Sequence, residues 1–117
     1  MDDKSRYMRI IYKTPEFEEF YSSLPFKTQT KFDYVINVIL TIYNVSTKYI
    51  KHLENTELYE MRVSVGTNEY RTILFAIDKD NIIESTEIIL LNAFLKKDNK
   101  DYRKQIEKAI SILNRFE

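Results

Sequence analysis

The chain has 117 residues, of which 44% are hydrophobic and 14% aromatic, so one ordinary core and a single domain over residues 1–117 are expected. Lysine plus arginine and aspartate plus glutamate both number 18, and this formal net charge of zero excludes a chain that is basic as a whole. Because there is no cysteine and only one histidine, His52, we expect no disulfide, no cysteine-based metal site and no multi-histidine zinc centre. No cofactor and no metal ligand are assigned.

The amino-terminal residues alternate charged with apolar side chains. The first twelve residues lack the apolar core of about 7 to 15 residues that a signal peptide needs, and no apolar run approaches the ~20 residues of a membrane span. We therefore expect a cytoplasmic protein with no membrane partner. Residues 7–12 are rich in β-forming side chains and predict a first strand.

Two helices are expected after this strand. Thr14 can cap the first, Pro15 suits its first turn, and the segment Ser22-Ser23-Leu24 closes it. Pro25 suits the start of the second helix. Apolar residues at helical spacing then form one stripe, which predicts a helix that faces the core: Phe32, Val35, Ile36, Ile39, Leu40 and Tyr43.

The second half of the chain predicts three strands and a final helix. A polar connector, residues 44–56, leads to residues 59–65, which alternate strictly between apolar and polar. A turn that holds Gly66, the only glycine, joins this strand to residues 70–78, and residues 82–94 continue the sheet after a second polar turn. A terminal helix that packs back on the sheet is predicted by the spacing of Tyr102, Ile106, Ala109, Ile110, Leu113 and Phe116.

The order strand, two helices, three strands, helix predicts an α+β domain with a small, mostly antiparallel sheet, two amino-terminal helices and one carboxy-terminal helix. We expect the helices to lie on one face of the sheet. The other face, with Glu60, Arg62 and Ser64, is then expected to be open to a ligand.

The candidate chemistry is a set of cations near the predicted hairpin. If Val65 pairs with Tyr70, then Arg71 points to the same face as Arg62, whereas a slip by one residue separates them. Together with Lys96 and Lys97 they would form an anion site, and guanidinium groups match phosphate oxygens. In the alternative, Arg62 pairs with Glu60 or Glu69 and the lysines are a solvated strand end.

Aromatic residues flank these cations. Tyr59, Tyr70 and Tyr102 could stack on RNA bases, although alternation places Tyr59 with Met61 in the core. Tyr102 lies five residues after Lys97, near the rim of the expected patch. His52 could act as a general acid or base, but a lone histidine in such a segment is more often inert.

Four segments in order resemble the RelE/ParE toxin superfamily, in particular its phage-derived, HigB-like branch. They are Leu58-Tyr59-Glu60-Met61-Arg62, Tyr70-Arg71, Phe94-Leu95-Lys96-Lys97 and Gln105-Ile106-Glu107-Lys108-Ala109. The resemblance covers about the last 70 residues. It implies a RelE-like fold and the toxin of a type II toxin–antitoxin system, a ribosome-dependent mRNA endonuclease (mRNA interferase).

In such enzymes the 2′-OH of the RNA attacks the adjacent phosphodiester, and no metal is needed. The resemblance then assigns catalysis to Arg71, which binds the scissile phosphate, to Arg62 and Lys97, which add positive charge, and to Tyr102 or a lysine, which moves protons. The candidate RNA-binding residues are Lys51, Lys96, Lys100 and Arg103. The implied partners are the ribosome, mRNA and an antitoxin, of helix-turn-helix type, from an adjacent gene.

The chain departs from this family pattern in two respects. Glu60 stands where the RelE branch has a lysine-rich strand, so the general base of that branch is missing. The chain is neutral, although many family toxins are basic. Two other functions stay open, namely a ParE-like toxin that inhibits gyrase without nuclease activity, and a non-catalytic binding member of the fold.

Overall fold

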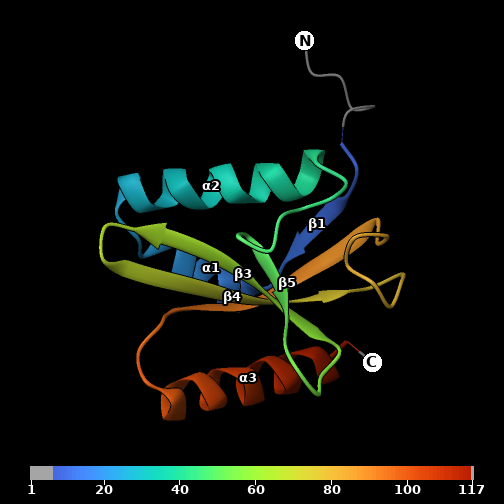
Figure 1. The fold of residues 1–117 in the computed structure, drawn as a ribbon. Helices are drawn as coiled ribbons and strands as arrows, with labels where there is room; N and C mark the ends of the chain where they lie inside the picture. Colours follow the sequence, from blue (N-terminus) through green and yellow to red (C-terminus); the bar gives the residue numbers. More distant parts are fainter. Residues whose placement is uncertain (1–6, 117) are drawn as a thin grey trace.

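In the computed structural model, which describes residues 7–116, one five-stranded sheet lies between helices (Figure 1). The strand order is β1-β5-β4-β3-β2, with β1 parallel to β5 and the other neighbours antiparallel. This confirms the predicted α+β class; residues 1–6 and 117 of the expected domain lie outside the described residues. The elements in chain order are β1 (Ile10–Lys13), α1 (Pro15–Ser22), α2 (Phe26–Thr41), β2 (Ile50–His52), β3 (Leu58–Val65), β4 (Asn68–Ala76), β5 (Glu87–Leu95) and α3 (Asn99–Asn114).

Local signals fix where the helices begin. Thr14 caps α1, because its hydroxyl accepts a hydrogen bond of 3.1 Å from the backbone N–H of Phe17, and Pro15 follows as the first helical residue. Asp98 caps α3 in the same way, with its carboxylate 2.8 Å from the N–H of Asp101. No helix among residues 7–116 is long and apolar enough to cross a membrane.

The expectation that all helices share one face of the sheet is wrong. Figure 1 shows α2 and α3 on opposite sides of the sheet, and two separate hydrophobic clusters fill the two interfaces. The cluster under α1 and α2 includes Phe17, Phe32, Met61, Tyr70, Leu74 and Leu90; the cluster under α3 includes Leu58, Ile73, Leu91, Ala109, Ile112 and Leu113. The physical reason is that β4 and β5, unlike β3, carry unbroken runs of buried residues, which need cover on both faces.

Some strands begin elsewhere than the sequence predicts. β1 begins at Ile10 rather than at residue 7, and β5 begins at Glu87 rather than at residue 82. The polar connector 44–56 contains a short edge strand, β2, in which Lys51 pairs with Glu60 of β3. A three-residue strand with two exposed side chains has no alternation long enough to detect.

A buried arginine joins three parts of the chain. Arg9, which is 4% exposed, donates to the carbonyls of Ile39, Ile42 and Tyr43 at the end of α2 over 2.8 Å each. It also donates to the carbonyls of residues 83 and 85 before β5. Its positive charge therefore satisfies the free carbonyls at the negative end of the α2 dipole.

Replacing this arginine is expected to destabilise the fold. Arg9→Ala leaves five buried or half-buried carbonyls without their donor, so the free energy of unfolding should fall by about 3 kcal/mol. Denaturant unfolding followed by circular dichroism measures this loss. Arg115→Ala, which removes an exposed arginine paired with Glu16, is the control and should leave stability nearly unchanged. Equal losses in the two variants would contradict the anchoring role.

Asp78 organises the segment before β5. Its carboxylate accepts hydrogen bonds from the hydroxyls of Ser85 and Thr86 and from the N–H groups of Thr86 and Glu87. These bonds, that from Ser85 above all, hold the pKa of Asp78 well below its usual range. They also explain why residues 82–86 turn rather than extend the strand.

The lowered pKa predicts an acid dependence of stability. The ionised Asp78 stabilises the fold above the unfolded pKa of about 3.9, and this contribution is lost as pH falls toward the lower folded pKa. The difference in unfolding free energy between wild type and Asp78→Asn should be constant above about pH 5 and shrink below about pH 4. Urea titrations across this range measure it. Asp80→Asn is the control, because it removes a charge from the same segment but leaves the hydrogen bonds of Asp78 intact. If its difference in unfolding free energy from the wild type also shrinks below about pH 4, Asp78 is not the source of the acid dependence.

Candidate functional site

The hairpin of β3 and β4 places two arginines side by side. Gly66, with φ +61°, adopts the left-handed conformation that the turn between β3 and β4 requires. Val65 therefore pairs with Asn68, and Arg62 lies directly opposite Arg71. The assumed pairing of Val65 with Tyr70 was wrong by two residues. A shift of two preserves the face, so Arg62 and Arg71 share one face as that pairing implied, but α3 packs on this face, which was expected to be open.

A buried carboxylate lies between these arginines. Glu60 is 2% exposed; its Oε2 lies 2.6 Å from Nε of Arg62 and 3.4 Å from Nε of Arg71. Tyr102 of α3 donates its hydroxyl to Oε1 of the same carboxylate. The pairing of Arg62 with Glu60, which the sequence left open as an alternative, is thus present. Two guanidinium groups share this carboxylate, and Arg71 also pairs with Glu69, so the charges of these four side chains balance.

The two arginines differ in access to solvent. The Arg62 side chain is 31% exposed, whereas that of Arg71 is 7% exposed. Arg71 donates from Nη1 to Oε1 of Glu69 at 3.3 Å and to its own backbone neighbour, the carbonyl of Tyr70, at 3.0 Å. The 3.4 Å contact of its Nε with Glu60 is too poorly aligned for a hydrogen bond, so this buried donor is unsatisfied. A hydrogen bond from Ser64, followed by that from Arg71, lowers the pKa of Glu69.

A polar cleft of about 260 Å³ opens beside this cluster. It lies where β2, β3, the end of β5 and the start of α3 meet, and we call it the polar cleft. Its lining residues are Lys51, His52, Leu53, Glu54, Glu60, Arg62, Lys96, Asn99 and Tyr102. The β2 pairing brings Lys51 beside Glu60, and the N–H of Lys96 donates to the carbonyl of Glu69, which extends β5 to the cleft.

The structure brings part of the predicted site together. Arg62, Tyr102, Lys51 and Lys96 line the polar cleft, and Arg71 contacts Glu60 at its base. The other predicted residues lie outside the lining, with exposed side chains: Lys97, Lys100 and Arg103. The tyrosines separate, because Tyr70 is buried on the α2 side between Phe20 and Phe32 and Tyr59 packs there as expected, so only Tyr102 accompanies the cations.

The central position of Glu60 and the place of His52 in the lining of the polar cleft were not predicted from the sequence. The signal for Glu60 was the spacing Glu60-Met61-Arg62, because residues two apart on a strand share a face. His52 donates from Nε2 to the carbonyl of Thr56 at 2.7 Å, and its ring meets the edge of Tyr59 at 5.1 Å. Among residues 7–116 no three histidine, aspartate or glutamate side chains gather closely enough to hold a metal ion.

Charge is unevenly distributed along the molecule. Residues 96–104 hold five cations and two acids, whereas residues 77–87 hold four acids and one lysine. β5 connects the two segments, which therefore lie at opposite ends of the sheet (Figure 1). The end of the molecule with the polar cleft is thus basic, although the net charge is zero.

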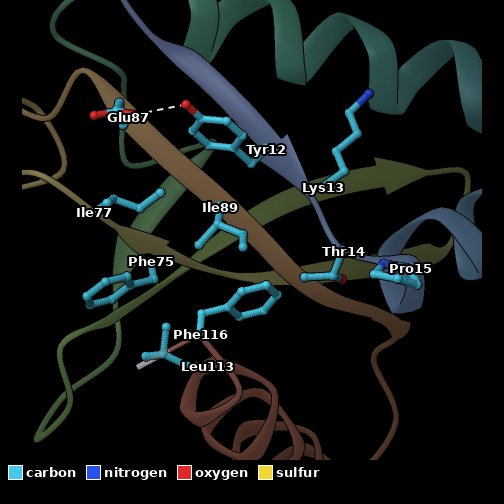
Figure 2. A pocket seen from close by; sticks show the side chains of 10 residues that line it. All are labelled: Tyr12, Lys13, Thr14, Pro15, Phe75, Ile77, Glu87, Ile89, Leu113 and Phe116. Atoms are coloured by element: carbon cyan, nitrogen blue, oxygen red, sulfur yellow. Dashed lines mark hydrogen bonds between the residues drawn. The ribbon is translucent and has the colours of Figure 1, made fainter.

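A larger hollow of about 530 Å³ has different chemistry. Figure 2 shows it between β1, β4, β5 and the end of α3, lined mainly by apolar side chains such as Phe75, Ile89 and Phe116. Its charged lining residues are Lys13 and Glu87, and Glu87 already accepts the Tyr12 hydroxyl. It therefore lacks the converging polar groups of a catalytic site, which the polar cleft provides.

The chain was compared with known proteins. The family model described as Phage derived protein Gp49-like (DUF891) matches residues 19–114. This range includes α2, every strand except β1, and the whole polar cleft. No curated protein matches the chain significantly.

The buried carboxylate predicts a large difference between two glutamates that contact Arg71. Glu60→Ala leaves the Arg62 guanidinium and the Tyr102 hydroxyl without their acceptor and removes one of the two ion pairs of buried Arg71, so the free energy of unfolding should fall by about 3 kcal/mol. Glu69→Ala, whose side chain is 43% exposed, should cost less than about 1 kcal/mol. Denaturant unfolding compares the two variants. Similar losses would show that Glu60 does not anchor the cluster.

Proposed function

Because the chain belongs to the Gp49-like family of phage-derived proteins, a family of RelE-like toxin–antitoxin toxins, we propose that it is a toxin that cleaves messenger RNA on the ribosome. The observation that carries this proposal is the cluster of Arg62, Arg71, Glu60 and Tyr102 beside a cleft rimmed by lysines. An always-charged guanidinium, an oriented phenol and nearby ammonium groups are what metal-independent phosphodiester chemistry requires.

The reaction is an internal transfer. The 2′-oxygen of the RNA bonds to the adjacent phosphorus, and the bond from phosphorus to the 5′-oxygen breaks. A proton leaves the 2′-hydroxyl and another is given to the departing 5′-oxygen, so the products are a 2′,3′-cyclic phosphate and a 5′-hydroxyl. Negative charge gathers on the phosphate oxygens midway, which is the charge that the protein must stabilise.

The exposures of the arginines suggest their roles. Arg62 faces the polar cleft, so we assign it the contact with the scissile phosphate. Arg71 lies behind it and acts through its charge and its hold on Glu60, a positioning role. Lys96 adds charge at the cleft, whereas Lys97, Lys100 and Arg103 attract RNA from outside it.

The two proton transfers need two groups. Tyr102 from α3 and His52 from β2 both line the polar cleft, and each can exchange a proton. Glu60 accepts the Tyr102 hydrogen bond and so orients the phenol toward the cleft. We propose that this pair replaces the lysine-rich strand of the RelE branch. We propose that the ribosome, by positioning the mRNA at the cleft, supplies the rest of the rate enhancement.

The partner that follows from the family is an antitoxin. We propose that it is encoded by an adjacent gene, carries a helix-turn-helix pattern and neutralises the toxin by binding it. A short reading frame with that pattern beside the gene supports this pairing.

Arg62→Ala is the sharpest test of the nuclease. Loss of one donor to the transition-state charge lowers such rates by about 100-fold or more. Expression of the wild type should create new mRNA 5′ ends that require translation, and Arg62→Ala should abolish most of them. Arg115→Ala, on the far end of α3, should cut like the wild type. Mapping of 5′ ends after induction measures all three.

The same experiment separates the competing functions. Growth arrest with intact mRNA and altered DNA supercoiling would overturn the nuclease and favour a gyrase inhibitor. Arg71 is less suitable for this test, because it is buried and its removal also perturbs folding.

A further inference from the structure

A second basic groove lies on the α2 side of the sheet. It has a volume of about 440 Å³ and lies between the first half of α2 and the tip of the β3–β4 hairpin. We call it the α2 groove. Its lining residues are Lys27, Thr30, Lys31, Tyr34, Ser64, Val65 and Gly66, which include two cations and no carboxylate. Asp33, the one acid between residues 26 and 49, accepts the Tyr21 hydroxyl instead.

Aromatic rings and lysines alternate beside this groove. Tyr34 is 54% exposed, and its ring meets the edge of Tyr49 with centroids 6.3 Å apart. The ammonium of Lys31 lies 6.0 Å from the Tyr34 ring centroid, and that of Lys48 lies 5.4 Å from the Tyr49 centroid. An exposed ring, Tyr34, and a half-buried ring, Tyr49, between cations suit a single strand of nucleic acid, which has both bases and phosphates.

Tyr49 lies between the α2 groove and the polar cleft, and its ring contacts Tyr34 of the groove. The carbonyl of Tyr49 accepts a hydrogen bond of 2.8 Å from the N–H of Arg62, which lines the cleft. Two residues after Tyr49, Lys51 also lines the cleft. Since β2 is the edge strand, no further strand of the described sheet lies between the two sites.

We propose that single-stranded RNA leaves the polar cleft over β2 and lies in the α2 groove, with bases on Tyr34 and Tyr49 and phosphates beside Lys48, Lys31 and Lys27. This inference rests on the proposed nuclease, because it extends the RNA of the same site. The groove thus adds affinity for RNA that flanks the scissile phosphate and takes no part in the chemistry.

Binding of two RNA lengths by the full chain tests this path. The probes are fluorescent 2′-O-methyl uridine oligomers, which lack the attacking hydroxyl, of about four and about twelve nucleotides. The double variant Lys27→Ala/Lys31→Ala should bind the long oligomer about tenfold more weakly than the wild type. The slope of the logarithm of the binding constant against the logarithm of the salt concentration should also be smaller by about 1.4, or ~0.7 for each lost phosphate contact. The short oligomer should bind to this variant and to the wild type with the same affinity. Fluorescence anisotropy at several salt concentrations measures both.

Two control variants match these changes. Lys79→Ala/Lys108→Ala removes the same charge from other surfaces and should leave both oligomers unaffected. Tyr34→Ala should weaken only the long oligomer, and Tyr34→Phe, which keeps the ring, should restore it.

The outcomes distinguish the path from the cleft. If Arg62→Ala weakens binding of both oligomers but Lys27→Ala/Lys31→Ala changes neither affinity, the proposed RNA path in the α2 groove is overturned and the polar cleft stands as the RNA site. In that case an acidic protein partner explains the lysines of the groove better. If the lysines affect binding of the long oligomer while Arg62→Ala changes neither affinity, the groove stands and the proposed contact of Arg62 with the RNA phosphate falls.

Discussion

The carboxylate of Glu60 connects the fold to the site. A buried charge is costly unless it is paired and hydrogen-bonded, and Glu60 meets this condition only while β3, β4 and α3 are all in place. Its partners Arg62, Arg71 and Tyr102 come from these three elements. The interaction that docks the start of α3 on the sheet therefore also sets the geometry of the polar cleft. For the same reason, substitutions in this cluster are expected to affect both the stability of the fold and the proposed chemistry. A substitution of Arg62, the more exposed arginine, perturbs the fold least and so tests the chemistry best.

The position of the cleft follows from how α3 covers the sheet. Apolar runs on both faces of β4 and β5 require a second layer, and the short connection after Leu95 places the start of α3 beside the hairpin. The apolar residues Ala109, Ile112 and Leu113 bury the second half of α3, whereas its first turns present Asn99 and Tyr102 to the cleft. A sheet face that was expected to be open is thus covered at one end and accessible at the other. Apolar packing holds the helix, and its polar end forms one wall of the site.

The sequence was informative wherever one local rule decided the outcome. The cap at Thr14, the helix start at Pro15, the stripe of α2 from Phe32 to Leu40 and the strand at β3 all depend on neighbouring residues, and these predictions are confirmed. Two details were wrong, because Tyr43 lies beyond α2 and is exposed, and Glu60 on the polar face of β3 is buried. The shared face of Arg62 and Arg71 was predicted only on condition of the register, because side-chain direction depends on the parity of the register, and the observed register meets that condition. What could not be predicted depends on distant contacts. β2 exists because β3 offers it a partner, residues 82–86 turn because Asp78 captures their donors, and Glu60 is buried because α3 returns to cover it.

A neutral chain can still hold a polyanion, because electrostatic attraction is local. At physiological ionic strength charges are screened over about 8 Å. β5 has nine residues and spans about 30 Å, which separates the acidic segment 77–87 from the cations after Leu95 by several screening lengths. If RNA binds at the polar cleft as proposed, it senses the lining charges, with Lys51, Arg62 and Lys96 outnumbering Glu54 and Glu60, rather than the net charge. Under the proposed function, the acidic end limits unspecific attraction of RNA at long range, and RNA that the ribosome holds near the cleft needs little such attraction. A balanced charge is thus compatible with the proposed nuclease and favours a substrate presented by a larger assembly over free RNA.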